Sequence, residues 1–266
     1  MSVNVLHEIL LQLGDAAVQA ARTPPRLLAV SKFQAATAVA NLAMAGQKEF
    51  GENYVQHARD KQSELSRLAA TSHPRLDLSS LQWHLIGHLQ SNKAKEAAER
   101  FDWVQTVDRE SLVKALAAHR PHDRSPLNVL IQVNIDDEAS KHGCAPGEVE
   151  LLADAVAAQP RLRLRGLMVI PTPHEDQEQR RPAFRRTRAL FEMLQRSHPE
   201  VDTLSMGMSD DATIAIAEGA TMVRIGTALF GARDRGPGIA GRGTGAGGQG
   251  PGAGDQGSAA AEAGDL

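Results

Sequence analysis

The segment RLLAVSKFQAATAVANLAMAG, residues 26–46, sets the pattern that the rest of the chain repeats. Its apolar start, Arg26–Ser31, predicts a buried strand, and Ala35–Gly46 predicts a helix that ends at a glycine. The same order of strand and helix recurs to residue 230. Further strands are expected at Glu49–Glu52, Gln82–Ile86, Trp103–Val107, Leu127–Ile135, Leu164–Ile170, Thr203–Met208 and Met222–Ile225. Further helices are expected at Tyr54–Ala69, Asn92–Arg100, Asp108–His119, Pro146–Ala158, Glu178–Ser197 and Asp210–Glu218, with a short helical turn after the last strand.

Eight strands that alternate with helices are typical of an α/β protein with a single (β/α)8 TIM barrel. A doubly wound parallel sheet is the competing architecture. Its nucleotide-binding version is disfavoured, because no GxGxxG follows the first strand and the chain has no GxxxxGK[ST] motif.

The last 32 residues, 235–266, differ from the rest in composition, because they hold 12 of the 23 glycines of the chain. Only Ile239 and Leu266 in this stretch are large aliphatic residues. Such a segment cannot bury enough apolar surface to offset its loss of backbone entropy. We therefore expect a barrel domain over residues 1–234 and a disordered tail over residues 235–266.

The charge balance and the single cysteine restrict the class of protein. The chain has 29 basic and 32 acidic residues, a net charge of −3, whereas a general nucleic-acid binder needs a basic face. No apolar run reaches the roughly 18 residues of a membrane span, and the N-terminus has no signal-peptide pattern. Cys144 has no partner for an internal disulfide. We expect a cytoplasmic protein that binds neither nucleic acid nor a membrane.

One lysine stands out by its position. In a barrel, chemistry takes place at the carboxyl ends of the strands, and Lys32 directly follows the first strand. Lys48 precedes the second strand, and Lys141 lies in the loop after the fifth; Lys61, Lys93, Lys95 and Lys114 are expected on polar helix faces. A desolvated lysine amine can attack an aldehyde, although a lysine at a strand end can also simply extend to solvent.

The ends of the last two strands resemble a phosphate site. Ser205 and Gly207 end the seventh strand, and Arg224, Gly226 and Thr227 end the eighth. Barrels often bind phosphate in the loops after these two strands, where a glycine lets the backbone approach the anion. A turn glycine is the plainer interpretation of Gly226. A phosphorylated aldehyde would satisfy both the lysine and this site.

The chain resembles a known family over residues 27–233. The matching motifs are LLAVSK (27–32), FGENYVQ (50–56), WHLIGHLQSNK (83–93), VLIQVNI (129–135), SKHG (140–143), GLM.IP (166–171) and LSMGMSDD…AI..G.TMVRIGTALFGAR (204–233). Together they are similar to the pyridoxal phosphate homeostasis proteins. The resemblance implies a fold-type III barrel like the N-terminal domain of alanine racemase. It also implies a role in vitamin B6 homeostasis.

The resemblance assigns roles to individual residues. It implies that Lys32 forms a Schiff base with the cofactor, pyridoxal 5′-phosphate, and that Arg224 faces the pyridine nitrogen. Ser205, Gly226 and Thr227 would bind the phosphate, and Asn53 and His84 would lie near the cofactor. Phe33 departs from the family pattern, in which threonine is common after the lysine.

Two classes of function stay open: a non-catalytic carrier, and an enzyme such as a weak amino-acid racemase or a Schiff-base aldolase. In alanine racemases the second base is a tyrosine of an additional domain, whereas Tyr54 is the only tyrosine here. A two-cysteine racemase is excluded by the single cysteine, and the sixth strand has no aldolase-type lysine. The sequence favours a monomeric carrier with no catalytic residues, and apoenzymes that depend on the cofactor are candidate acceptors.

Other clusters favour structural roles. His84 and His88 are four residues apart, but Gly87 separates them and no HExxH motif is present, so no metal site is expected. Asp210 and Asp211 are expected to cap a helix. The arginines at 180, 181, 185, 186 and 188 are expected on a solvated helix face, and Cys144 in a loop.

Overall fold

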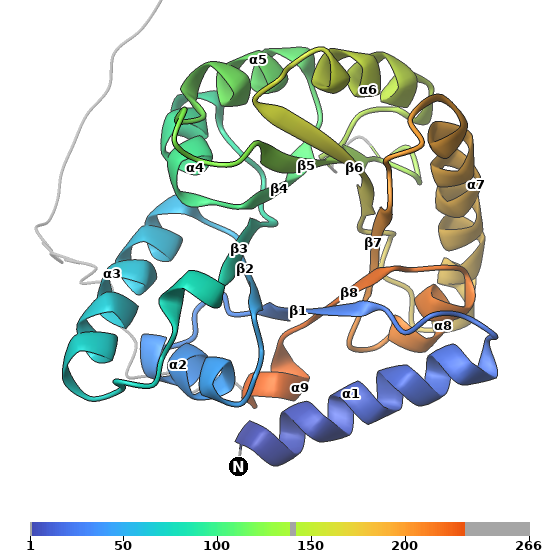
Figure 1. The fold of residues 1–266 in the computed structure, drawn as a ribbon. Coiled ribbons are helices and arrows are strands. Elements are labelled where there is room, and N and C mark those ends of the chain that lie inside the picture. Colours follow the sequence, from blue (N-terminus) through green and yellow to red (C-terminus); the bar gives the residue numbers. More distant parts are fainter. Residues whose placement is uncertain (1, 139–141, 232–266) are drawn as a thin grey trace, which may run out of the picture. The chain divides into compact units, whose positions relative to one another are not determined.

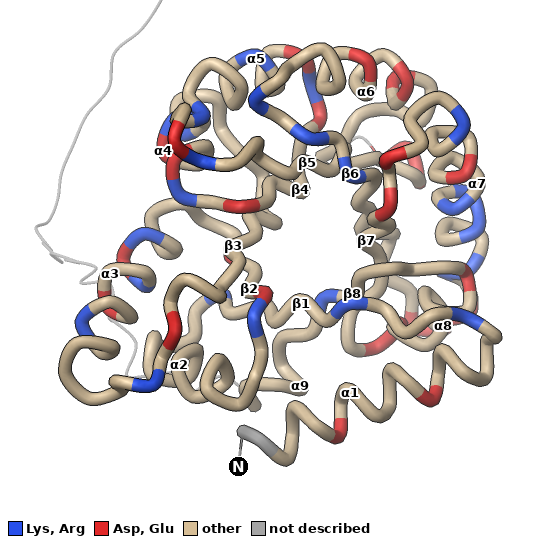
Figure 2. The backbone as a smooth tube through the Cα atoms, in the orientation of Figure 1, with Lys and Arg blue, Asp and Glu red and all other residues tan. Residues whose placement is uncertain are grey.

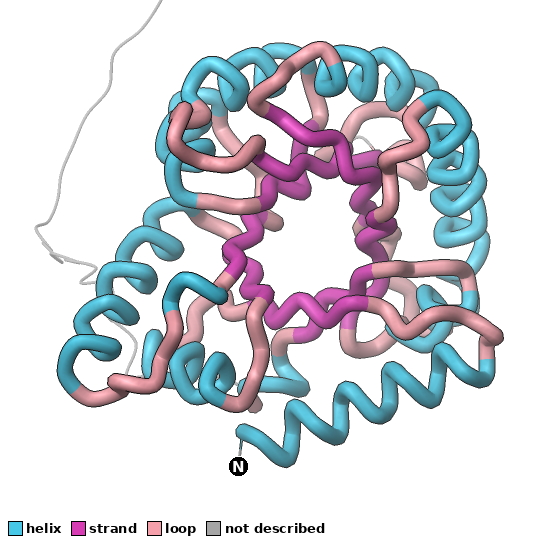
Figure 3. The backbone as a smooth tube through the Cα atoms, in the orientation of Figure 1, coloured by secondary structure: helices cyan, strands magenta, loops and turns pink. Residues whose placement is uncertain are grey.

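The structure is a computed structural model that describes residues 2–138 and 142–231. Within these ranges, eight parallel strands pair in chain order, and β8 pairs with β1 to close a barrel. Figure 3 shows this ring of strands inside an outer ring of helices. The predicted (β/α)8 barrel is confirmed; the predicted tail, residues 235–266, lies outside the described residues. The strands are β1 Arg26–Val30, β2 Glu49–Glu52, β3 Gln82–Leu85, β4 Trp103–Val107, β5 Leu127–Val133, β6 Leu162–Val169, β7 Thr203–Met208 and β8 Met222–Ile225.

The helices lie outside the strands (Figure 1). The first, α1, precedes the barrel and packs against α8 and α9. It buries Leu6, Ile9 and Leu13, whereas Leu10 is exposed. No helix in the described part of the chain combines the length and the apolar character of a membrane span. The helices are α1 Ser2–Gln19, α2 Ala36–Met44, α3 Val55–Thr71, α4 Ala94–Arg100, α5 Glu110–His119, α6 Val149–Ala157, α7 Arg181–Ser197, α8 Ala212–Ala217 and α9 Thr227–Phe230.

The predicted strand bounds agree with the structure at β2, β4, β7 and β8. Several helices begin later than predicted, because a 3₁₀ turn precedes them. Such turns are common at helix ends. Before α6, for example, Pro146 fits the first turn because its missing N–H would have no partner there. The 3₁₀ turns are η1 Leu78–Ser80, η2 Ser91–Lys93, η3 Pro146–Glu148 and η4 Gln177–Arg180.

The core has two layers, because successive strand residues point to opposite faces. Outward-facing residues such as Leu27 and Ala29 join a large cluster under the helices. A small inner cluster of Trp103, Leu130 and Met168 fills the barrel axis. Most of the buried apolar area, which stabilises the fold, therefore lies between the strands and the helices.

Charged groups also line the barrel interior near the amino ends of the strands. The guanidinium groups of Arg26 and Arg165 lie 4.9 and 4.8 Å from the ring centroid of Trp103. His84 stacks on the same indole, with ring centroids 5.1 Å apart. Since Arg26 points inward, alternation along β1 places Lys32 on the inner side at the opposite end, which is the mouth of the barrel.

Candidate functional site at the carboxyl ends of the strands

Lys32 lies in the turn that follows β1 and is partly exposed. No hydrogen bond or ion pair within residues 2–138 and 142–231 engages its amine. The next residue, Phe33, has a φ of 61°, which is uncommon for a residue with a side chain. The left-handed conformation at Phe33 turns the chain sharply after Lys32 and fixes where that lysine leaves the strand.

The neighbouring strand brings Arg224 to the same end of the barrel. β1 and β8 pair with Leu28 opposite Arg224. Arg224 is 4% exposed, and its Nη2 donates to the carbonyl oxygen of Val169 at 2.8 Å. Burial lowers the pKa of Arg224 to about 10, so the guanidinium remains charged at neutral pH. No carboxylate in the described ranges forms an ion pair with Arg224.

Ser205 contacts Nη1, the other terminal nitrogen of this guanidinium. Its Oγ accepts a hydrogen bond from Nη1 of Arg224 at 2.8 Å and donates one to Oε1 of Gln105 at 2.7 Å. Ser205 is fully buried inside the barrel. The structure therefore brings Ser205 to Arg224, and the hydroxyl is engaged with protein groups.

The same network reaches His84. Nε2 of Gln105 lies 2.9 Å from Nδ1 of His84, and because that amide donates, Nδ1 accepts and the proton is on Nε2. His84 is fully buried, and burial together with the charge of Arg26 lowers the pKa of its imidazole well below its usual value. His84 is therefore neutral and lies in the interior below the mouth. A chain of hydrogen bonds connects it to Arg224.

Gly226 and Thr227 lie beside β1, where α9 begins. A Cβ on Gly226 would lie 3.3 Å from the carbonyl oxygen of Val30, so the backbones pass closely there. Thr227 is exposed and starts the first turn of α9. The first amide groups of a helix have no intrahelical acceptor. Backbone N–H groups and a hydroxyl are thus available at the end of the strand that neighbours Lys32.

Asn53 lies at the mouth beside Gly87. A Cβ at Gly87 would come within 2.1 Å of the carbonyl oxygen of Asn53, so this contact requires a glycine. Asn53 also lines a pocket of about 300 Å³ with Tyr54, His88 and Lys93. Of the seven predicted residues, Lys32, Asn53, Arg224, Gly226 and Thr227 therefore lie at the mouth, and Ser205 and His84 lie beneath it.

Lys61 is a residue that the sequence analysis placed wrongly. This lysine was expected on a polar helix face, but on α3 it is buried, with 8% of its surface exposed. Its Nζ donates to the carbonyl oxygen of Ser31 at 2.5 Å and to Oε1 of Glu52. The hydroxyl of Ser31 also donates to this carboxylate, at 2.7 Å. Lys61 thereby fixes the peptide group that precedes Lys32. The sequence at the ends of β1 and β2, Ser31–Lys32 and Gly51–Glu52, does not indicate this contact. Lys61 lies nine residues beyond Glu52 in the chain.

Asp211 differs from its predicted role as well. It occupies the N-cap position of α8, but its side chain makes no capping hydrogen bond. Oδ1 instead accepts from the backbone N–H of Met208 at 2.6 Å, and Oδ2 accepts from Arg180 at 2.7 Å. The carboxylate therefore closes the turn after β7, and its charge also favours the charged form of Arg224.

The prediction of a solvated face holds for Arg185 and Arg186, which are exposed, whereas Arg180, Arg181 and Arg188 are partly buried. Basic residues predominate along α7 (Figure 2), and Glu192 is its one acidic residue. Each of the five arginines forms an ion pair with an acidic side chain. The exposed pairs among them contribute little stability each. The pair of Arg180 with Asp211 is largely buried, with side chains 12% and 2% exposed.

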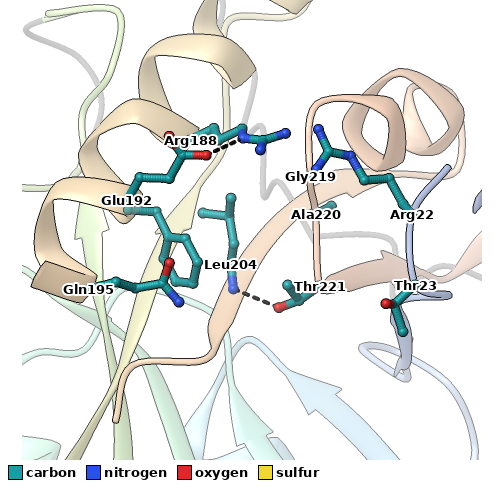
Figure 4. Close-up of a pocket in the computed structure, with 10 residues that line it drawn as sticks. Arg22, Thr23, Arg188, Glu192, Gln195, Leu204, Gly219, Ala220 and Thr221 are labelled. Atoms are coloured by element: carbon teal, nitrogen blue, oxygen red, sulfur yellow. Dashed lines mark hydrogen bonds and ion pairs between the residues drawn. The ribbon is translucent and has the colours of Figure 1, made fainter. Parts of the chain in front are cut away.

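Another pocket, of about 240 Å³, lies at the amino ends of the strands (Figure 4). Arg22 and Thr23 line it from the segment before β1, and Ala220 and Thr221 from the segment before β8. Arg188 lies across the pocket from Arg22 and pairs with Glu192 at 2.6 Å. This pocket is at the opposite end from Lys32 and contains none of the predicted site residues.

Comparison with known proteins identifies the family. Residues 15–234 match the family described as alanine racemase, N-terminal domain. The chain is 49% identical to the pyridoxal phosphate homeostasis protein of Escherichia coli K12 over 225 residues, which are 84% of this chain and 93% of that protein. It is also 49% identical to the protein of the same name from Pseudomonas aeruginosa over 233 residues, 87% of this chain and 95% of that protein.

Solved structures agree with this assignment. PipY of Synechococcus elongatus with pyridoxal phosphate bound has a TM-score of 0.73 and 33% identity, over 87% of this chain and all of PipY. Alanine racemase from Corynebacterium glutamicum, at 18% identity and a TM-score of 0.55, shares the fold over 85% of this chain and 62% of its own. The chain therefore belongs to the family of pyridoxal phosphate homeostasis proteins, and its barrel is an alanine racemase N-terminal domain.

Proposed function

We propose that this chain binds pyridoxal 5′-phosphate at the mouth of the barrel, with Lys32 as the Schiff-base lysine, and acts in vitamin B6 homeostasis without efficient turnover. The observation that supports this most directly is the pairing of β1 with β8. It puts the lysine, a buried guanidinium and a glycine with a close backbone contact on neighbouring strand ends.

The residues present fit this cofactor. The amine of Lys32 is not engaged by other described groups, so it is available to an aldehyde carbon. Gly226 and Thr227 offer backbone N–H groups and a hydroxyl to a phosphate. When bound, pyridoxal phosphate supplies an aldehyde that condenses with a lysine and an aromatic ring that accepts electrons.

Arg224 would hold the pyridine nitrogen. A guanidinium has five N–H donors and no acceptor, and two of those of Arg224 are directed at Ser205 and Val169. The charge of Arg224 disfavours a proton on a nearby ring nitrogen. Arg224 would therefore keep that nitrogen unprotonated, and an unprotonated ring is a poorer acceptor of electrons. Ser205 would act by fixing the position of Arg224, and not as a direct phosphate ligand.

The second base of alanine racemases is a tyrosine of an additional domain, whereas the one tyrosine of this chain, Tyr54, belongs to the barrel. Tyr54 is half-exposed, at 51%, and its ring packs against Phe33 and His57 near the turn that follows β1. A general base contributes about 10²–10⁴-fold to a rate, so we expect at most weak side activity.

Absorption spectroscopy tests the binding proposal. Full-length protein titrated with pyridoxal phosphate should develop the visible band of a lysine Schiff base. Borohydride should then fix the cofactor on Lys32 in a peptide map. K32A should lose the band, whereas K48A, a change at the opposite end of β2, should keep it. A label on another lysine, or no band at saturating cofactor, would contradict the proposal.

Chiral analysis of alanine and other amino acids separates the carrier from the enzyme. We expect no saturable racemisation by cofactor-loaded protein after long incubation. Efficient turnover that is lost in K32A would instead favour the racemase alternative.

A further inference from the structure

Three side chains with metal-binding atoms gather at the mouth from three successive loops. His88 follows β3, Asp108 follows β4 and His142 follows β5, and one nitrogen or oxygen atom of each lies within 4.8 Å of the others. The rings of His88 and His142 stack with centroids 3.8 Å apart at an interplanar angle of 14°. Nδ1 of His88 lies 3.8 Å from Oδ2 of Asp108.

These separations are too long for hydrogen bonds but suit ligands of one metal ion. Metal–nitrogen and metal–oxygen bonds of about 2.1 Å in tetrahedral geometry place the ligand atoms roughly 3.4 Å apart. The two rings must rotate out of their stacked arrangement for a nitrogen of each to face the same ion. His88 and His142 are exposed, so their rings can rotate without disturbing the core.

The chemistry of the three side chains suits a cation. Asp108 adds a negative charge on the same side. A neutral imidazole and an ionised carboxylate are the forms that bind metal ions.

Neighbouring groups fix two of the three ligands. Nη1 of Arg109 donates to Oδ1 of Asp108 at 2.5 Å, which leaves Oδ2 facing His88. Nη2 of the same arginine donates to the carbonyl oxygen of Leu89 at 3.0 Å and thus ties down the loop of His88. Outer contacts of this type orient metal ligands and tune their affinity.

The backbone of the third ligand is fixed as well. Nε2 of Gln132 donates to the carbonyl oxygen of His142 at 3.1 Å. Gly143 has a φ of +123°, and a Cβ there would lie 2.6 Å from the nitrogen of Asn134, so only glycine fits. Cys144, predicted to be a loop residue, is buried and forms a β-bridge with Val133. His142 therefore projects from a well-anchored turn.

We propose that His88, Asp108 and His142 bind one divalent transition-metal ion, such as Zn²⁺ or Co²⁺, at the rim of the barrel. Two imidazoles and one carboxylate are a ligand set for these ions, with further coordination positions left open. His88 also lines the pocket that contains Asn53 and Lys93, so the open positions lie beside that pocket. The pair that the sequence suggested, His84 and His88, is not the site, because His84 is buried in the barrel interior. The inference does not depend on cofactor binding.

Calorimetry and cobalt spectroscopy test the site on full-length protein without a histidine tag, stripped with a chelator. Zn²⁺ should bind with a stoichiometry of one, and Co²⁺ should give visible ligand-field bands. H88A, H142A and D108N should each weaken binding at least about tenfold. H73A, which removes a partly exposed histidine elsewhere, should bind as the wild type does.

Two further variants separate loss of the metal site from loss of the fold and from metal held by the cofactor. H142Q changes an exposed side chain, and circular dichroism should show its fold intact while Zn²⁺ affinity falls. K32A, without the Schiff-base lysine, should keep the full Zn²⁺ affinity, which separates this site from metal held by the cofactor. Unchanged affinity in the H88A/H142A double variant, or a stoichiometry well below one, would overturn the proposal.

Discussion

The hydroxyl of Ser205 lies 2.8 Å from Nη1 of Arg224 and, as an acceptor, holds that buried guanidinium at the mouth of the barrel. The same oxygen donates to Gln105, which contacts His84. A serine that sequence analysis assigned to phosphate thus belongs to a chain of hydrogen bonds that ends at Arg224. Its replacement should act on the cofactor through the arginine.

The variant S205A should bind pyridoxal phosphate more weakly and shift the absorption band of the bound cofactor. It removes the acceptor of a charged donor, which costs about 1.5–3 kcal/mol where such a bond is buried. We expect a loss in affinity of roughly fivefold, about 1 kcal/mol, because Val169 still holds Nη2. Spectral titration measures both effects. S63A, which changes an exposed serine of α3, is the control, and an unchanged band in S205A would argue against a positioning role.

R224E should protonate the pyridine nitrogen of the bound cofactor. A carboxylate favours a nearby proton, whereas the guanidinium disfavours it. Nitrogen-15 resonances of labelled cofactor should move to the protonated range in R224E and stay in the unprotonated range in R224Q. If the ring nitrogen of the wild-type complex is already protonated near neutral pH, the proposed role of Arg224 is wrong.

K61M should destabilise the fold much more than a surface lysine change does. Removing Lys61 leaves the fully buried carboxylate of Glu52 without its cation, which costs about 3–5 kcal/mol. Chemical denaturation should show this loss, and K95M, an exposed change on α4, should be near neutral. The double variant K61M/E52Q should recover part of the stability, because no unpaired charge remains. Equal stabilities of K61M and K95M would mean that the buried pair contributes nothing.

Stability should fall on acidification, in part because of His84. Burial lowers the pKa of this imidazole in the folded state, so below about pH 6.5 the unfolded chain binds a proton that the folded chain does not. This difference lowers the free energy of unfolding by up to about 1.4 kcal/mol per pH unit as the pH falls. The raised pKa of Glu49, whose Oε2 lies 3.8 Å from His84 Nε2, has the opposite sign and partly offsets it.

H84N isolates the contribution of the histidine. Its amide can keep the contact with Gln105 but does not titrate. Denaturation at pH 5, 6 and 7 should show a shallower loss of stability in H84N than in the wild type. A wild-type slope that H84N does not reduce would mean that His84 is protonated in the folded protein.

The sequence by itself determined the barrel and the positions of Lys32, Arg224 and Gly226 at strand ends. Short apolar runs, amphipathic stretches and glycine stops are local signals, and the bounds of β2, β4, β7 and β8 were predicted from them. The motifs that identify the family are contiguous too. A strand, helix or motif that is encoded within about ten neighbouring residues can be predicted without knowing which other segments it packs against.

Only the tertiary structure decided what each polar group touches. Lys61 appeared to be a surface residue, yet α3 turns it toward the carboxylate of Glu52 under the first strand end. Ser205 is predicted to bind phosphate, and the structure adds a hydrogen bond from Arg224 to its hydroxyl inside the barrel. His88 and His142, 54 positions apart in the sequence, stack because β3 and β5 end at the same rim. Burial and partners of polar side chains depend on strand register and helix rotation across the whole barrel, and no local pattern encodes them.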